Sequence, residues 1–581
     1  MNHQKWLLAL TISGLVGVAH AGEKDELLKL RNTTTNLIKQ LVKQGVITDK
    51  MAEEMIKQAE ADAEQQAAIA KAEGAAKDAV PADEVRVAYV PDFVKDEIRQ
   101  QVRQELREDV TSDVMQKAKN EQWGLPNALP DWTKRFKLSG DLRLRSQHDF
   151  MAEDNITGAN TALFYPDVMA INDAGGMQAA GIDAAMNTND DRQQFRQRLR
   201  LGIDAQISDS VSAGVRLATG NQRDPVSTNQ TLGFTGQHYD FAVDRAYLKY
   251  EAVDDQKFKW LTVKGGRIAN PFYTGGGEFT GGSEMVWDTD LSFEGAAATF
   301  RHNLLGDGLS NAGDQPRSLF FTAGAFPLQE SARSSDKWLF GGQAGVDWGF
   351  DNQDNLKLGL AYYDFVNVQA KPNTVDPFTC NLNNHANNAS RPQFTQGGNT
   401  LANICRESLT QPVGALGYAS DFDILNINAS YDLAVMAPYH LRFSGDYAQN
   451  FGFNRDEIIR TFGNNSILPH GGVESGSSER IKQDQNKAWQ VRVDYGWPIA
   501  ERAGHWNVFA AYKYVERDAV VDGLNDSDFH LGGTNNKGWF IGGNYGLMKN
   551  VWLTGRWLTA DVITGPPFGV DVLQIDLNTK F

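Results

Sequence analysis

Hydrophobic and polar positions along the chain follow two different periods, and the change between them falls near residue 136. From about residue 22 to residue 120, apolar residues recur every three or four positions, as Leu27, Leu30, Leu37 and Leu41 do, which predicts α-helices. From Phe136 onward, apolar and polar residues alternate one by one, which predicts β-strands with one apolar face. The pattern therefore predicts a helical N-terminal region followed by a larger β region.

The region before residue 136 divides into three predicted parts. Residues 1–21 are expected to be a signal peptide, because Lys5 precedes an apolar stretch and small residues flank His20. Residues 22–80 predict a helical hairpin, since Gly45 interrupts the first helix and Thr48 can cap the second. Residues 81–135 predict a linker and a third helix, whose apolar stripe suits either a coiled coil or packing on its own subunit.

Residues 136–581 contain sixteen stretches that alternate with a period of two. They cover residues 136–147, 193–207, 211–221, 240–251, 258–268, 293–302, 318–327, 339–350, 355–367, 421–433, 440–450, 487–498, 504–516, 537–547, 550–562 and 570–581. The connections alternate between short and long along the chain, which is typical of membrane barrels with short turns at one end. The prediction is a mainly β protein with a 16-stranded antiparallel transmembrane β-barrel.

The last predicted strand ends on an aromatic residue. Leu573, Ile575, Leu577 and Phe581 share one face of it. A terminal aromatic residue on an alternating strand resembles the signal that outer-membrane assembly machinery recognises. Phe581 is therefore the candidate assembly signal, and the barrel-assembly machinery is an expected partner.

Composition narrows the possible functions. Lys and Arg number 56 against 73 Asp and Glu, and the net charge of −17 argues against a nucleic-acid partner. The only two cysteines are Cys380 and Cys405, and in an exported chain they are expected to form a disulfide bond. Two free thiols are the alternative.

Short motifs are spread over most of the chain, at residues 41–48 (LVKQGVIT), 87–95 (VAYVPDFVK), 129–132 (LPDW), 140–145 (GDLRLR), 266–272 (GRIANPF), 287–290 (WDTD) and 294–295 (EG). Together they resemble a porin family of Gram-negative bacteria whose members carry an N-terminal coiled-coil region. The resemblance implies an outer-membrane porin and leaves the solute open. Ala88 stands where a proline is expected, which affects no functional residue.

Basic residues are predicted to line one wall of the lumen. By the alternation, the inward positions include Arg143, Arg145, Arg196, Arg198, Arg200, Arg216, Arg245 and Lys249. Guanidinium groups that line a water-filled channel attract anions. The alternative is a solvated lattice of ion pairs with Asp141, Asp204 and Asp244, which has no role in selectivity.

The connection between the fifth and sixth predicted strands is the third external loop. It contains Gly275–Gly277 and the acidic residues Glu278, Glu284, Asp288 and Asp290. It resembles the inward-folded constriction loop of general porins, whose acidic residues face an arginine wall. The hypothesis is a constriction with acidic groups on one side and arginines on the other.

Catalytic motifs are missing from the sequence. It has no HExxH motif, phosphate-binding loop or nucleophile elbow, so no catalytic residue, metal or cofactor is predicted. The predicted function is passive diffusion of small hydrophilic solutes or ions, and the expected surroundings are outer-membrane lipid and two further copies in a homotrimer. The alternative is a structural tether, in which periplasmic helices bind peptidoglycan and the barrel serves as an anchor.

Overall fold

The computed structural model describes residues 131–158, 160–255, 257–276, 281–304, 317–332, 334–373, 387–405, 413–463, 466–469, 481 and 483–581. They belong to one compact unit, Leu125–Phe581. The predicted signal peptide, helical hairpin and third helix lie outside the described residues, so these remain predictions. Within the described part of the chain, no helix is long and apolar enough to cross a membrane.

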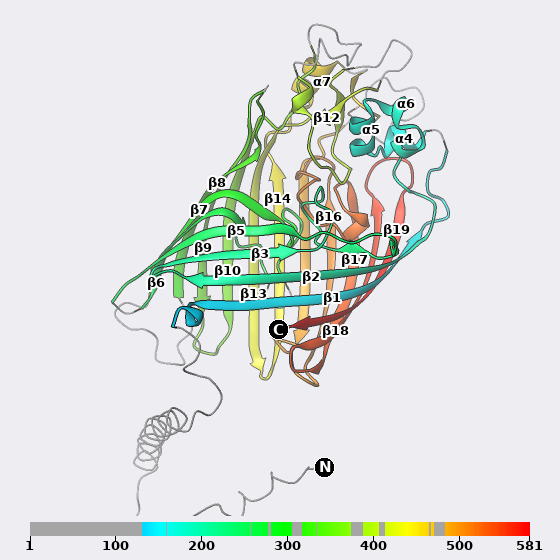
Figure 1. Ribbon diagram of the computed structural model, residues 1–581. Coiled ribbons are helices and arrows are strands. Elements are labelled where there is room, and N and C mark those ends of the chain that lie inside the picture. Colours follow the sequence, from blue (N-terminus) through cyan, green and yellow to red (C-terminus); the bar gives the residue numbers. More distant parts are fainter. Residues whose placement is uncertain are drawn as a thin grey trace, which may run out of the picture. The chain divides into compact units, whose positions relative to one another are not determined.

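Sixteen long strands form the wall of a barrel (Figure 1). They are β1 (Phe136–Met151), β2 (Arg192–Gln206), β3 (Val211–Ala218), β5 (Ala242–Val253), β6 (Lys259–Ala269), β7 (Ser292–Asn303), β8 (Arg317–Gln329), β9 (Lys337–Gly349), β10 (Asn355–Val366), β13 (Phe422–Met436), β14 (Tyr439–Asn450), β15 (Lys487–Gly496), β16 (Trp506–Val515), β17 (Asn536–Met548), β18 (Val551–Val562) and β19 (Gly569–Lys580).

The barrel is closed and antiparallel throughout. Each wall strand pairs with the next one along the chain, and β19 pairs with β1 from Asp141 opposite Lys580 to Met151 opposite Val570. Beyond that ladder, the backbone N–H of Gly140 donates to Phe581 O (2.9 Å) and the N–H of Phe581 donates to Gly140 O (3.0 Å). The prediction of a 16-stranded antiparallel barrel is confirmed.

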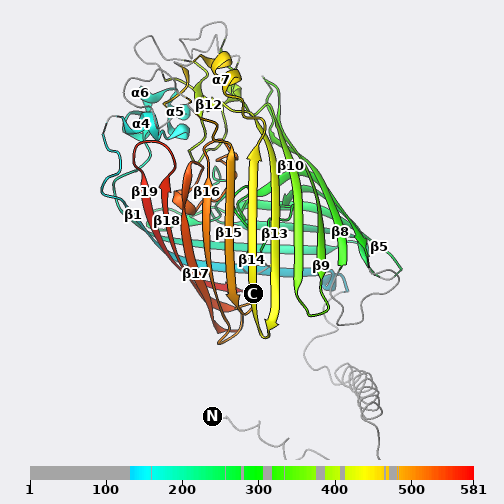
Figure 2. The same ribbon diagram turned by 180° about the vertical axis from the view of Figure 1, so that it is seen from behind.

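The six longest connections lie at one end of the barrel, and the shortest turns lie at the other (Figures 1 and 2). Short turns join β2 to β3, β9 to β10 and β17 to β18, whereas residues 152–191, 219–241, 270–291, 367–421, 451–486 and 516–535 connect strands at the other end. The smaller elements are η1 (Asp131–Arg135), α4 (Thr161–Phe164), α5 (Val168–Ala174), α6 (Met177–Ala180), η2 (Gly181–Ala184), β4 (Gln230–Thr231), η3 (Asn388–Ser390), β11 (Leu401–Asn403), β12 (Leu416–Tyr418), α7 (Arg455–Phe462) and η5 (Phe529–Leu531).

Local capping explains where the two longest loop helices begin and end. The Asp167 side chain accepts a hydrogen bond from Ala170 N at the start of α5, and Gly175 ends that helix in the left-handed region at φ 86°. At α7, the Asn454 side chain accepts a hydrogen bond from Glu457 N. Both helices therefore have the polar caps that short helices need.

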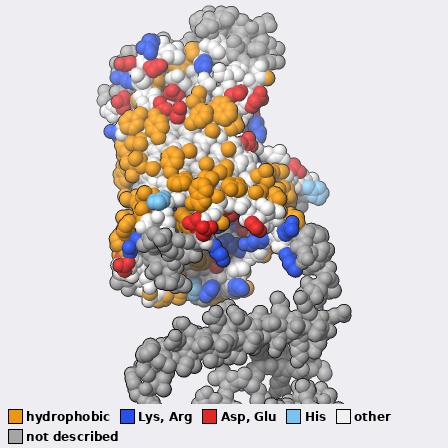
Figure 3. All heavy atoms as spheres, turned by 90° about the vertical axis from the view of Figure 1, so that its left-hand side faces the viewer, with side chains coloured by type: hydrophobic (Ala, Val, Ile, Leu, Met, Phe, Trp, Pro, Cys, Tyr) orange, Lys and Arg blue, Asp and Glu red, His pale blue; other side chains and the backbone are white. Residues whose placement is uncertain are grey.

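The wall is apolar outside and polar inside. Large hydrophobic residues are exposed on the outer face, such as Phe195, Leu201 and Ile203 of β2, and Figure 3 shows hydrophobic side chains gathered in a band across the middle of one outer face. Inward positions of β13 carry Asn426 and Asn428, which are buried. An apolar outer face and a polar inner face are typical of a barrel that is surrounded by lipid and has a hydrated interior.

Residues 281–291 of the third long connection pack against the inner face of the barrel. Trp287 is buried, and its ring centroid lies 5.0 Å from that of Phe293 in β7 and 4.9 Å from that of Tyr363 in β10. Edge-to-face aromatic contacts at these distances are favourable beyond the area that they bury. They fix the segment to the wall.

Candidate functional site

The eight predicted basic residues occupy four consecutive strands, with β1 carrying Arg143 and Arg145, β2 carrying Arg196, Arg198 and Arg200, β3 carrying Arg216, and β5 carrying Arg245 and Lys249. The register places like charges directly opposite one another: Arg143 faces Arg198, Arg145 faces Arg196, Arg216 faces Arg245, and Lys249 faces Lys264 of β6. Like charges in direct cross-strand positions are destabilising. The eight predicted basic residues are called the basic wall below. Their mutual repulsion requires nearby acidic or polar side chains to offset it.

Arg145 has the most complete compensation in the basic wall. Its side chain is 0% exposed. Nε and Nη2 donate to the two carboxylate oxygens of Asp576 at 2.8 and 2.9 Å, while Nη1 donates to Asp528 Oδ1 at 2.9 Å. Asp528 also pairs with Arg556 of β18. Arg145 therefore links β1 and β19 to the connection that contains Asp528.

Arg198 and Arg200 share two carboxylates. Arg200 Nε lies 2.8 Å from Asp141 Oδ2, and Arg198 Nη2 lies 3.1 Å from Asp141 Oδ1. On their other side, Asp290 Oδ1 lies 3.1 Å from Arg200 Nη1 and 3.5 Å from Arg198 Nη1. Asp290 is thus one predicted acidic residue that the structure brings onto the basic wall.

Three arginines of the basic wall contact neutral side chains. Arg143 Nη2 donates to Asn229 Oδ1 (2.5 Å), and Arg245 Nε donates to Ser292 Oγ (3.3 Å). Arg196 donates to Gln147 Oε1 and Ser227 Oγ. Within the described part of the chain, Arg143, Arg196 and Arg245 form no ion pair, whereas Arg216 pairs with Asp244 and Lys249 with Glu251. The wall therefore retains unpaired positive charge.

Among the described residues, Glu284 and Asp288 of the third connection form no ion pair or hydrogen bond with the basic wall. Asp288 Oδ2 accepts a hydrogen bond from Ser527 N (3.0 Å), and Glu284 Oε1 accepts one from Thr289 Oγ1 (2.6 Å). Burial raises the pKa of Asp288, and neighbouring Glu284 raises it further. Burial also opposes ionisation of Asp290, but Arg198 and Arg200 hold its pKa below the ordinary value. Glu278 lies outside the described residues.

Residues 516–535 form a second inward connection, which the sequence pattern did not predict. Asp526 pairs with Lys513 of β16, and Asp528 pairs with Arg145 and Arg556. Asp522 accepts hydrogen bonds from Tyr418 Oη (2.6 Å) and Gly397 N (2.9 Å) of another long connection. The sequence did contain a signal for these pairs. Residues 516–535 include four aspartates, and the arginines predicted to point into the lumen needed acidic partners.

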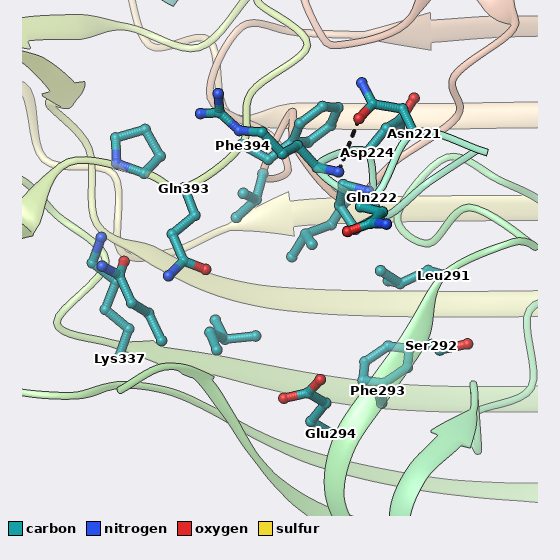
Figure 4. Close-up of a pocket in the computed structure, with 18 of the residues that line it drawn as sticks. Asn221, Gln222, Asp224, Leu291, Ser292, Phe293, Glu294, Lys337, Gln393 and Phe394 are labelled. Carbon is teal, nitrogen blue, oxygen red and sulfur yellow. Dashed lines mark hydrogen bonds between the residues drawn. The ribbon is translucent and has the colours of Figure 1, made fainter. Parts of the chain in front are cut away.

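A cavity of 700 Å³ lies among the long connections and the adjoining ends of β3 and β5 to β10 (Figure 4). Residues from five connections line it, including Asp173, Gln222, Leu291, Gln393 and Leu524. The volume falls in the range of about 300–1,000 Å³ that small-molecule pockets occupy. The cavity is therefore large enough for a small solute.

The remaining predicted residues have separate positions. Cys405 is buried in a loop cluster with Phe453 and Ile458, while Cys380 lies outside the described residues, so the disulfide bond stays a prediction. Phe581 follows β19 at the short-turn end of the barrel. In the described ranges, no group of three or more His, Cys, Asp or Glu residues could hold a metal ion.

Comparison with known proteins identifies the family. No curated protein matches the chain. The outer membrane channel DcaP of Acinetobacter baumannii is 12% identical over 77% of this chain and 97% of its own, with a TM-score of 0.37. OprB of Pseudomonas putida, in its high-pH structure, is 12% identical over 77% of this chain and 95% of its own, with a TM-score of 0.40. The family model described as "Putative porin" matches residues 31–581, and the chain therefore belongs to this porin family.

Proposed function

We propose that this protein forms a water-filled channel in an outer membrane, through which small hydrophilic solutes and ions diffuse passively. The observation that carries the proposal is the closed barrel with an apolar outer face and charged, hydrogen-bonded residues inside. A barrel whose interior is polar is stable in lipid only if that interior is hydrated or filled by its own polar groups. Membership of the porin family supports the same function.

The unpaired arginines are proposed to give the channel a preference for anions. Arg143, Arg196 and Arg245 bind neutral partners, so their charge is not cancelled by a contacting carboxylate. A permanently charged guanidinium attracts anions to the lumen. Residues 281–291 are proposed to narrow the passage beside this wall, because Asp290 pairs with Arg198 and Arg200 there.

Single-channel recording of the purified protein in a planar bilayer, under a salt gradient, tests both the open channel and its preference for anions. We expect stepwise conductance and a reversal potential with the sign of an anion-preferring channel. The triple variant Arg143→Gln, Arg196→Gln, Arg245→Gln should keep the conductance and lose most of the preference. The matched control, Arg492→Gln with Asp494→Asn, removes a 2.7 Å ion pair of β15 without changing the net charge. It should leave the reversal potential unchanged.

Two outcomes would contradict the proposal. Folded barrels without conductance would exclude an open channel and favour the tether to peptidoglycan through the N-terminal helices. An unchanged reversal potential in the triple variant would exclude a role of these arginines in selectivity. Deleting residues 23–120 then separates the functions, since loss of cell-wall association with normal conductance would assign the tether to that region.

The partners are proposed on separate grounds. Outer-membrane lipid is expected around the apolar band of the wall. A homotrimer is proposed, and native gel electrophoresis of the extracted protein is the direct test. Phe581 is proposed as the signal for barrel-assembly machinery, and Cys380 and Cys405 as a disulfide pair that a thiol-labelling assay would find unreactive.

A further inference from the structure

We propose that the 700 Å³ cavity is a binding subsite for an uncharged, polyhydroxylated solute, such as a sugar of one or two rings. The inference rests on the proposed channel function and names a solute class for it. Three features of the lining carry it: charges that are already paired or hydrogen-bonded, amide groups that are not engaged, and an aromatic floor.

The charged groups of the lining are satisfied by other protein groups. Arg223 holds Asp173 with two hydrogen bonds of 2.6 and 3.1 Å, and Arg267 Nη1 lies 2.7 Å from Glu294 Oε1. Lys337 Nζ donates to Ser390 O at 3.1 Å. A charged solute would have to break such a contact before it gained a partner of its own. A neutral solute would not have to do so.

The lining contains equal numbers of acidic and basic side chains. The acidic ones are Asp173, Asp224, Asp244 and Glu294, and the basic ones are Arg223, Arg267, Lys337 and Arg391. With every carboxyl group ionised, their formal charges cancel. The cavity thus differs from the basic wall, where arginines face one another and three of them have neutral partners. Electrostatics therefore favours an uncharged solute in the cavity.

Three amide side chains of the lining are available to a solute. Gln222, Gln329 and Gln393 come from different elements, and among the described residues their side chains form no hydrogen bond. Figure 4 shows Gln222 and Gln393 on two different connections around the cavity. A side-chain amide offers both a donor and an acceptor. A hydroxyl group also has both, so amides pair well with neighbouring hydroxyls of a sugar.

The floor of the cavity is apolar. Leu291, Phe293, Phe326 and Phe365 line it, and the ring centroids of Phe293 and Phe326 lie 5.0 Å apart. Solute pockets commonly combine such an apolar surface with a few placed polar groups. A sugar ring matches this combination, because its C–H groups can face the floor while its hydroxyls reach the amides.

The test measures block of the ion current through the full-length channel by added glucose or maltose. We expect a saturable fall in current with sugar concentration, and no saturable fall with glucuronate, which keeps the glucose ring and adds a carboxylate. The double variant Gln222→Leu, Gln393→Leu should weaken the block by about tenfold, because it removes two neutral hydrogen-bonding groups. Gln237→Leu is the control, since Gln237 is an exposed amide of the same connection as Gln222 and does not line the cavity.

Each result separates the subsite from the channel. Normal conductance without saturable block by either sugar overturns the subsite and leaves the channel function intact, whereas missing conductance in folded barrels overturns the channel function. Block that is undiminished in the double variant also overturns this location for the subsite. Gln393→Ala, which adds no bulk, is the second variant if the double variant does not fold, and it should weaken the block while Gln237→Ala does not.

Discussion

Replacing Arg145 with methionine should destabilise the barrel and loosen the connection formed by residues 516–535. The guanidinium holds Asp576 through bonds of 2.8 and 2.9 Å and Asp528 through bonds of 2.9 and 3.2 Å. Methionine fills much of the same volume but donates no hydrogen bond. The variant therefore leaves the Asp576 carboxylate, whose side chain is 4% exposed, without its contacting cation.

These contacts bound the expected loss in the free energy of unfolding. Removing one partner of a buried ion pair costs about 3–5 kcal/mol, because the other charge stays buried without compensation. Asp528 keeps Arg556 as a partner, so only Asp576 loses its contacting cation. We therefore expect the free energy of unfolding to fall by about 3 kcal/mol, the lower end of that range. The double variant Arg145→Met, Asp576→Asn removes both charges and should recover more than half of the loss.

Urea unfolding in lipid vesicles, followed by tryptophan fluorescence, measures the free energy of unfolding. Single-channel recording provides the second readout, since Asp528 anchors residues 516–535 to the wall and a looser connection should raise open-channel noise. Arg492→Met is the control: it breaks a similarly buried pair with Asp494, but both partners belong to β15. It should lower stability without raising the noise. A loss below about 1 kcal/mol for Arg145→Met, or a double variant no better than the single one, would refute the reasoning.

Three further predictions follow from individual contacts. Burial raises the pKa of Asp522 to about 6 from an ordinary value of 3.8, so its contribution to stability is full below pH 3.8 and is lost as the pH rises through about 6. Hydrogen exchange at the backbone amides of residues 516–535, corrected for intrinsic rates, should therefore become slower as the pH falls from 7 to 5. Asp522→Asn should make this exchange less dependent on pH. Trp287→Ala should cost about 3–5 kcal/mol in urea unfolding and increase the conductance, because it removes the main aromatic anchor of residues 281–291; unchanged conductance would mean that these residues do not narrow the passage. Gly266→Val should reduce the folded fraction on heat-modifiability gels, since Gly266 has a φ of 116° and a Cβ atom there would collide with the backbone carbonyl of Ala246, whereas Gly555→Val has open space and should fold normally.

The barrel could be predicted from the sequence because its signal is local. A strand that faces lipid on one side and water on the other alternates along its own length, as Leu201 and Ile203 do with Arg200 and Asp204. Each strand therefore carries its own evidence, and sixteen of them can be counted without knowing how they pair. The inward positions of the arginines follow from the same alternation.

The partners of those arginines could not be predicted in the same way. Arg145 and Asp576 are 431 positions apart in the sequence, and only closure of the barrel brings them together. Residues 516–535 have no repeating pattern of apolar and polar positions, because their side chains contact different parts of the barrel and of other connections. Asp290 was predicted to face an arginine wall, but its direct contact with Arg198 and Arg200 depends on how far the third connection folds inward.

The pairing of β1 with β19 also bears on how the protein can fold. All other neighbouring wall strands are consecutive along the chain and can form ladders locally, whereas this one joins the first strand to the last. The exposed edges of β1 and β19 must both be kept from other strands until the whole barrel sequence has been synthesised. Closing this pair before the intervening strands have paired would cost more chain entropy than any other pairing in the wall, so closure is expected to be a late step of folding.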